Sequence, residues 1–216
     1  MKPLYQASSF LLLSLLIGCT GKTKDINQVQ DKPQKVLVDG PCEDCTLIYQ
    51  GMPEHITAID TSAGWKEPGQ KLVVEGTVWK PDGKTPAPGV IVYYWQTDHT
   101  GEYTKTAEEK TVHGHLRGWM KSDLSGNYKI YTVKPVSYPS STIPAHIHFL
   151  IKEPDIANEY YIEDLLFDDD RFLTESVRAK LQQRGGNGIG KTRTENGITY
   201  IRRDIIVGLN IPKYPK

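Results

Sequence analysis

The chain has 216 residues, with 26 basic and 26 acidic side chains and a formal net charge of zero. A hydrophobic content of 38% is enough to build a core and excludes a chain that is disordered by composition. The balanced charge gives no electrostatic reason to bind nucleic acid. We therefore expect one folded domain and no nucleic acid partner.

The first residues predict an exported protein with a lipid anchor. Lys2 gives a positive start, and residues 10–17 form an apolar run that is too short to span a bilayer as a mature helix. The Leu-Ile-Gly-Cys sequence that ends at Cys19 resembles a bacterial lipobox, in which the cysteine is lipidated. We predict a signal peptide over residues 1–19 and a lipoprotein that faces the periplasm or the cell surface. An ordinary secretory signal is the alternative.

Residues 20–35 are polar and lack hydrophobic periodicity, which predicts a flexible tether before a domain over residues 36–216. Cys42 and Cys45 form an isolated Cys-x-x-Cys pair at the start of that domain. A zinc site would need two further ligands, whereas an exported protein can keep disulfides. A disulfide between the two cysteines is the preferred interpretation, and a pair of free thiols is the alternative.

The rest of the chain consists of short runs rich in β-branched and aromatic residues, at residues 71–80, 90–96, 127–133, 145–152 and 199–209. Turn residues separate them, for example Asn196-Gly197, which suits a tight hairpin. One helix is expected between a capping residue, Thr174, and a terminating residue, Gly185. The predicted fold class is all-β: a β-sandwich with one short helix and long loops.

Two His-x-His pairs are the first candidates for chemistry. His146 and His148 alternate with apolar residues, so a strand would project both imidazoles from one face and bury the opposite face in the core. Spacing alone is weak evidence for a metal site, because histidines also serve as ordinary core or surface residues. His113 and His115 lack this alternation, and we expect them at a pocket edge or on the surface.

A longer pattern resembles a known family. The segment GNYKIYTVKPVSYP, residues 126–139, followed by PAHIHF at residues 144–149, resembles the core motif of the intradiol ring-cleavage dioxygenases that act on catechol and protocatechuate. Leu-Arg-Gly at residues 116–118 and Gly-Glu-Tyr at residues 101–103 also resemble that family. The resemblance covers about residues 71–154 and implies a prealbumin-like or transthyretin-like sandwich.

The resemblance implies a non-haem ferric ion, Fe(3+), held by Tyr103, Tyr138, His146 and His148. Ferric iron is a hard Lewis acid that favours anionic oxygen, which fits the two phenol groups. The implied activity is that of an oxidoreductase that opens the ring of a catechol-type aromatic between its two hydroxylated carbons and incorporates both atoms of O2. Tyr138 would be the tyrosine that the substrate displaces and that helps to accept a proton.

One departure from the family pattern concerns charge. Ile143 stands where the best-known members carry an arginine that stabilises negative charge on the substrate ring. Losing a cation beside a developing anion would cost several kcal/mol of barrier lowering. Arg117, on a neighbouring strand, is the candidate catalytic replacement. The family glutamine that follows the second histidine has no clear counterpart, and Glu163 lies near its place.

Two other functions fit parts of the sequence. Residues 76–98 also resemble transthyretin-like surface domains, which would make the protein an anchored binding module. A protein that binds iron or a catecholate without turnover would tolerate the loss of the arginine. The sequence leaves open which aromatic compound is handled and whether the subunits form a homo-oligomer.

Overall fold

The computed structural model of the protein describes residues 37–40 and 42–215. The expected signal peptide, its Cys19 and the expected tether lie outside these residues. Over the part that is described, no helix combines the length and the apolar character needed to cross a bilayer. Strands make up most of the regular secondary structure among the described residues, which confirms the all-β class expected from the sequence.

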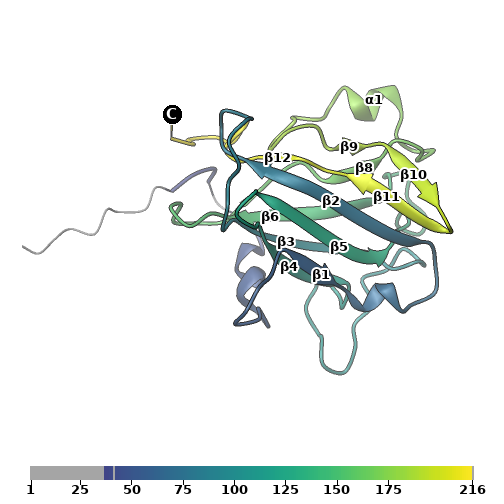
Figure 1. Ribbon diagram of the computed structural model, residues 1–216. Coiled ribbons are helices and arrows are strands. Elements are labelled where there is room, and N and C mark those ends of the chain that lie inside the picture. Colours follow the sequence, from purple (N-terminus) through teal and green to yellow (C-terminus); the bar gives the residue numbers. More distant parts are fainter. Residues whose placement is uncertain (1–36, 41, 216) are drawn as a thin grey trace, which may run out of the picture. The chain divides into compact units, whose positions relative to one another are not determined.

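Two six-stranded sheets form the domain (Figure 1). The first sheet is built around a long antiparallel pair, β2 (Lys71–Trp79) and β5 (Asn127–Val133). Its strands follow the order β1 (Ile59–Thr61), β5, β2, β11 (Ile198–Arg202) and β10 (Thr192–Glu195). The short strand β12 (Ile205–Ile206) also pairs with β2. The second sheet follows the order β4 (Arg117–Lys121), β3 (Ile91–Gln96), β6 (His146–Lys152), β8 (Leu165–Phe167) and β9 (Ile189–Gly190), with β7 (Tyr160–Tyr161) paired to β6.

The main core lies between the sheets, and β6 shows how the sequence builds it. Ile147, Phe149 and Ile151 alternate along this strand, are fully buried and join one apolar cluster with Leu72 and Val74 of β2. Burying a side chain of this size is worth about 1.5–3 kcal/mol relative to leaving it exposed. The apolar face expected opposite the two histidines of the motif is therefore confirmed as core.

The other face of β6 carries the two histidines of the motif and Leu150. A smaller apolar cluster covers part of this face. It includes Tyr93 and Trp95 of β3 together with Ile48 of η1 (Cys45–Tyr49), a 3-10 helix. The second sheet is thus buried on both faces around β3 and β6, so polar groups on either face need partners inside the protein.

Local structure agrees with most of the turn and cap signals. Cys42 and Cys45 are joined by a disulfide with their Cα atoms 5.5 Å apart. Asn196 and Gly197 both have positive φ, 50° and 76°, which is the geometry of a tight turn between β10 and β11. A second 3-10 helix, η2 (Ala63–Trp65), precedes β2.

The helix is shorter than the sequence predicted. The hydroxyl of Thr174 accepts a hydrogen bond from the N–H of Val177, but α1 covers only Glu175–Arg178. The next N–H groups reach back three residues instead of four, and Gln183 has a φ of 54°. The chain therefore leaves the helix before the expected stop at Gly185.

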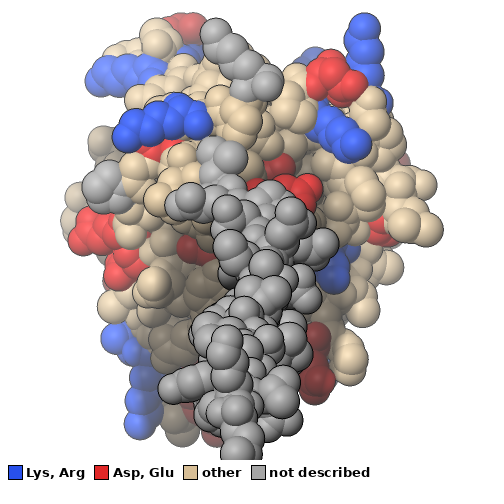
Figure 2. Space-filling model, turned by 90° about the vertical axis from the view of Figure 1, so that its left-hand side faces the viewer, with Lys and Arg blue, Asp and Glu red and all other residues tan. Residues whose placement is uncertain are grey.

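The surface carries interspersed charge. On the face shown in Figure 2, basic and acidic side chains lie among uncharged residues. Pairs such as Lys129 with Glu75, at 3.1 Å, place opposite charges side by side. Such exposed pairs contribute about 0–1 kcal/mol each, so the charge balance bears on solubility more than on the fold.

Candidate metal centre

Two phenol and two imidazole groups converge at the start of β6. His146 and His148 project from one face of this strand. Tyr138 comes from the loop between β5 and β6, and Tyr103 comes from the loop that follows β3. The Tyr138 Oη lies 3.0 Å from His146 Nε2, and the Tyr103 Oη lies 3.0 Å from His148 Nε2. The two phenol oxygens are 2.8 Å apart, and the two Nε2 atoms are 3.1 Å apart.

The four residues expected from the sequence to share one metal therefore present their donor atoms to one another. We call this group, Tyr103, Tyr138, His146 and His148, the four-donor cluster. Its atoms come from three separate segments of the chain, and the second sheet together with its loops brings them to one place.

The other nitrogen of each imidazole determines where the proton lies. His146 Nδ1 is 2.7 Å from the carbonyl oxygen of Pro144, and a carbonyl oxygen can only accept a hydrogen bond. His148 Nδ1 is 2.9 Å from Asp164 Oδ1, a carboxylate oxygen that also accepts. Both Nδ1 atoms therefore act as donors, and both Nε2 atoms point into the cluster.

Burial opposes charge on the groups of the cluster. It raises the pKa of the Tyr103 and Tyr138 phenols and lowers the pKa of His146, so both phenols stay protonated and this imidazole stays neutral near pH 7. Two phenol protons are then shared among four atoms that all carry lone pairs. A cation in place of these protons would satisfy all four atoms at once, and a mixed oxygen and nitrogen donor set suits iron better than zinc.

Asp164 is the neighbour of the cluster that the sequence did not predict. Among the described residues, His146, His148 and Asp164 offer candidate ligand atoms within 4.8 Å of one another. Asp164 faces Nδ1 of His148 rather than the lone pairs of the cluster, so it orients the imidazole instead of completing the donor set. Glu163, which lies near the place of the family glutamine in the sequence, accepts a hydrogen bond from the N–H of Arg184 over 3.4 Å.

Gly101 allows the two tyrosine loops to approach each other. Its φ is 88°, and a Cβ atom at this position would lie 2.4 Å from the carbonyl oxygen of Ser137. Only glycine fits such a close backbone approach. The sequence Gly-Glu-Tyr thereby places Tyr103 against the loop that carries Tyr138.

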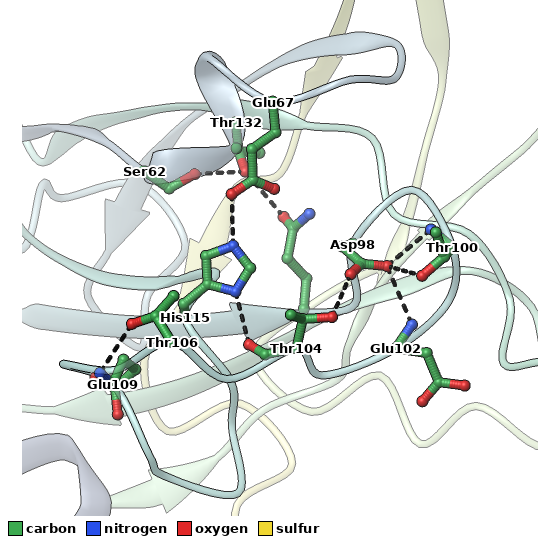
Figure 3. A network of polar contacts seen from close by, with 12 residues as sticks. Ser62, Glu67, Asp98, Thr100, Glu102, Thr104, Thr106, Glu109, His115 and Thr132 are labelled. Carbon is green, nitrogen blue, oxygen red and sulfur yellow. Dashed lines mark hydrogen bonds and ion pairs between the residues drawn. The ribbon is translucent and has the colours of Figure 1, made fainter.

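The carboxylate of Asp98 holds the loop that carries Tyr103 through several hydrogen bonds (Figure 3). Its carboxylate accepts hydrogen bonds from the N–H and hydroxyl of Thr100 over 2.7 and 2.6 Å, and from the hydroxyl of Thr104 over 2.7 Å. Although burial opposes it, this set of donors lowers the pKa of Asp98 to about 2. The residues on both sides of Tyr103 are thus tied to one carboxylate.

His115 closes the other side of the same loop. Its Nε2 lies 2.5 Å from Glu67 Oε1, and its Nδ1 lies 2.6 Å from the carbonyl oxygen of Thr104 (Figure 3). Burial opposes protonation, but these two acceptors raise the pKa of His115 above its ordinary value. His115 therefore ties the loop to Glu67, in the segment that follows η2, and both of its ring nitrogens face acceptors rather than the cluster.

Arg117 lies outside the four-donor cluster. Its guanidinium forms an ion pair with Glu109 and donates to the carbonyl oxygen of Gln50 over 2.8 Å. In the register of the second sheet, Trp95 lies between Arg117 and His148. The structure does not bring Arg117 to the cluster, and the catalytic role expected for it stays a prediction.

His113 is buried, so the expected position at a pocket edge or on the surface is wrong for this residue. It is 6% exposed, its ring stacks on Trp95 with centres 4.0 Å apart, and its Nδ1 lies 2.8 Å from the hydroxyl oxygen of Tyr93. Burial lowers the pKa of His113 to about 4, which keeps the ring neutral near pH 7. Its polar contact ends on Tyr93 rather than in the cluster.

Comparison with known proteins identifies a shared family. Residues 42–194 match the model of a family described as "Dioxygenase". The chain is 30% identical over 164 residues to a 6-chlorohydroxyquinol 1,2-dioxygenase of Cupriavidus pinatubonensis, a match that covers 67% of this chain and 55% of that protein. It is 26% identical to a hydroxyquinol 1,2-dioxygenase of Corynebacterium glutamicum, with 68% and 51% covered. The chain thus spans about half the length of the curated relatives it matches.

Solved structures show the same fold at low identity. A hydroxyquinol 1,2-dioxygenase from Pseudomonas putida DLL-E4 superposes with a TM-score of 0.54 at 24% identity, covering 84% of this chain and 68% of that one. A 3-chlorocatechol 1,2-dioxygenase from Rhodococcus opacus gives a TM-score of 0.56 at 18% identity, with 80% and 72% covered.

Proposed function

Because this chain belongs to the intradiol ring-cleavage dioxygenase family, we propose that it opens the ring of a catechol-type aromatic between its two hydroxylated carbons, with both atoms of O2. Catechol and hydroxyquinol, which the names of its relatives mention, are the first compounds to try. The single observation that carries the proposal is the convergence of two phenol oxygens and two Nε2 atoms, in contact at 2.8–3.1 Å.

The four-donor cluster would hold a non-haem ferric ion. Two tyrosinates supply the anionic oxygen that this hard cation prefers, and two neutral imidazoles complete the set. When bound, the iron supplies a Lewis acid that lowers the pKa of the phenols and activates a catecholate toward O2. The carbonyl oxygen of Pro144 accepts a hydrogen bond from His146 Nδ1, and the carboxylate of Asp164 accepts one from His148 Nδ1. These bonds fix the orientation of both imidazoles.

The residues of the cluster differ in how firmly they are held. Tyr103 lies in the loop that Asp98 and His115 restrain through hydrogen bonds to Thr104. Tyr138 lies in a loop that also lines a surface cavity of about 750 Å³. Tyr138 is therefore the phenol that an incoming aromatic would meet first, and we assign it the role of the ligand that would give way to the substrate and accept a substrate proton.

Metal analysis and spectroscopy test the proposal on the purified protein. We expect about one iron per chain, a visible tyrosinate-to-iron absorption band and oxygen uptake on addition of catechol or hydroxyquinol. Tyr138→Phe should shift or weaken the band while the protein stays folded. A colourless wild type that lacks iron would contradict the iron site, whereas a coloured protein without oxygen uptake would contradict turnover alone.

We further propose that the chain is exported and lipid-anchored at Cys19. The apolar run of residues 10–17 and the lipobox-like sequence before the cysteine support this proposal. The expected outcome is recovery of the wild type in the membrane fraction with a lipid on its N-terminal cysteine by mass spectrometry. Cys19→Ser should lack the lipid, and equal lipid modification in both would overturn the assignment.

A further inference from the structure

The two histidines of the four-donor cluster differ in what lies against the faces of their rings. The indole of Trp95 stacks on the imidazole of His148, with ring centres 4.7 Å apart and planes inclined by 22°. The close aromatic contacts of His146 are instead nearly perpendicular, at 89° to Tyr138 and 80° to His148. An indole thus packs flat on one of the two candidate imidazole ligands and not on the other, within the part of the chain that the structure describes.

The register of the second sheet produces this stack. Trp95 of β3 and His148 of β6 are paired directly across the two antiparallel strands. Residues paired in this way project from the same face of a sheet, with Cβ atoms about 4.5–5.5 Å apart, which brings the two rings into contact. The place of the indole is therefore set by backbone pairing and needs no metal.

Neighbouring rings hold the indole itself in place. Trp95 is 6% exposed, and the ring of His113 stacks on it with centres 4.0 Å apart and planes 6° apart. Tyr93 also stacks on Trp95 at 5.4 Å, and Tyr161 meets it edge-on at 5.9 Å. Trp95 is therefore unable to turn away from His148 without displacing these rings.

Two contacts restrain the His148 ring in different directions. The hydrogen bond from its Nδ1 to the carboxylate of Asp164, over 2.9 Å, acts within the plane of the imidazole. The indole of Trp95 acts on the face of the ring and opposes tilting out of that plane. Together they keep Nε2 directed at the hydroxyl of Tyr103, because packing and a hydrogen bond behind a ligand fix its orientation.

We propose that Trp95 is a positioning residue for the metal centre. By stacking on His148 it fixes the plane of the imidazole, so that Nε2 keeps a single direction into the four-donor cluster. The part of this inference that concerns iron rests on the proposed function, whereas the part that concerns the orientation of the ring does not.

Nuclear magnetic resonance of the metal-free protein, with isotope-labelled histidine rings, tests the orientation without iron. The wild type should show a slowly exchanging Nδ1–H signal for His148, because this proton is bonded to Asp164 in a fixed ring. Trp95→Met fills the space with a flexible chain and should make this proton exchange about 2- to 12-fold faster, the change that loss of an aromatic stack produces in a local opening equilibrium. Trp95→Phe keeps an aromatic face and should retain most of the protection.

Electron paramagnetic resonance of the iron-loaded protein tests the consequence for the metal. One fixed direction of the His148 Nε2 should give one sharp ferric signal in the wild type. With iron supplied in excess, Trp95→Met should still bind about one iron per chain, but its ferric signal should be broadened and its visible band shifted. Trp95→Phe should resemble the wild type.

Trp119→Met is the matched control. Trp119 packs against the same apolar cluster as Trp95 and stacks on Tyr93 with ring centres 5.3 Å apart, but its described ring contacts do not include His148. The control should lose comparable stability to urea and keep the proton exchange and the ferric signal of the wild type. Equal spectral changes in Trp95→Met and Trp119→Met, or an unprotected Nδ1–H in the wild type, would overturn the inference.

The outcome separates this inference from the proposed function. If the wild type binds no iron, the proposed function is wrong, and the exchange of the Nδ1 proton in the metal-free variants alone decides whether Trp95 holds the imidazole. If the wild type binds iron and Trp95→Met matches it in both experiments, only the role of Trp95 is wrong.

Discussion

Two polar groups lie on the same face of the second sheet and differ in how their hydrogen bonds are satisfied. The first is the four-donor cluster. The second, which we call the closed cluster, consists of Tyr93, His113, Arg117 and Glu109. Trp95 stacks on a histidine of each, with ring centres 4.7 Å from His148 and 4.0 Å from His113.

The difference between the two clusters lies in their protons. In the closed cluster, the Arg117 guanidinium meets the Glu109 carboxylate, and His113 meets the Tyr93 hydroxyl, so donors and acceptors match. In the four-donor cluster, two phenol protons serve four lone-pair atoms. A buried histidine is therefore not by itself a sign of a metal site, whereas a surplus of converging lone pairs is.

The largest expected effect is on metal content. His146→Ala removes one of the four donor atoms, so iron affinity should fall by more than the roughly 10–100-fold that follows loss of an outer partner. Elemental analysis should find less than about a tenth of an equivalent of iron. His113→Ala, in the closed cluster, should keep its iron. Equal iron loss in both variants would erase the distinction between the clusters.

Breaking the closed cluster should instead reduce stability. Arg117→Ala leaves the Glu109 carboxylate without its partner and the carbonyl oxygen of Gln50 without its donor, at a cost of about 3 kcal/mol in the free energy of unfolding. Urea denaturation measures this change, and the iron content should stay that of the wild type. Lys129→Ala, which breaks an exposed pair with Glu75, should cost less than about 1 kcal/mol. A similar loss in both variants would contradict the prediction.

Asp164 should act on the metal through His148. Asp164→Ala removes the acceptor of the Nδ1 proton, so we expect iron affinity to drop about 10–100-fold in competition with a chelator. Glu163→Gln is the matched control, because the neighbouring carboxylate does not contact the cluster. The assignment is wrong if the two variants release iron equally readily.

The smallest expected effect is a pH dependence of stability. The unfolded chain protonates His113 near its ordinary pKa of about 6.5, whereas the folded protein does so only near 4. The unfolded state therefore binds more protons between these values, and stability falls as the pH falls from about 6.5 to about 4. On this basis His113 costs about 2 kcal/mol at pH 5 relative to pH 8.

His113→Phe tests this origin. Denaturation of the metal-free wild type and variant at pH 8 and pH 5 should show a smaller loss in the variant. Identical losses would show that other groups cause the pH dependence.

The sequence predicted the parts of the site that depend on local pattern. Alternation along residues 145–152 identified β6 and separated the histidine face from the core face. The motif resemblance named Tyr103 and Tyr138, which no periodicity could have singled out. Asn196-Gly197 gave a hairpin because both residues tolerate positive φ.

The missed parts depend on which strands pair. Asp164 comes to His148 because Leu165 pairs with Ile147 across β6 and β8, and the sequence does not reveal that register. The strand β4 contains Gly118 and lacks a clear period, so periodicity did not add it to the expected strand runs, although Arg117 was expected to lie on a strand. Beyond the early end of α1, Arg184 forms an ion pair with Asp39, a partner far away in the sequence that local pattern does not reveal.

Gly101 has a consequence for how the donor atoms are spaced. It lets the two tyrosine loops approach backbone to backbone, while the carboxylate of Asp98 and the carbonyl oxygen of Pro144 fix neighbouring residues. A larger residue at position 101 would push Ser137 away and so widen the distance between the Tyr103 and Tyr138 hydroxyls without replacing either of them.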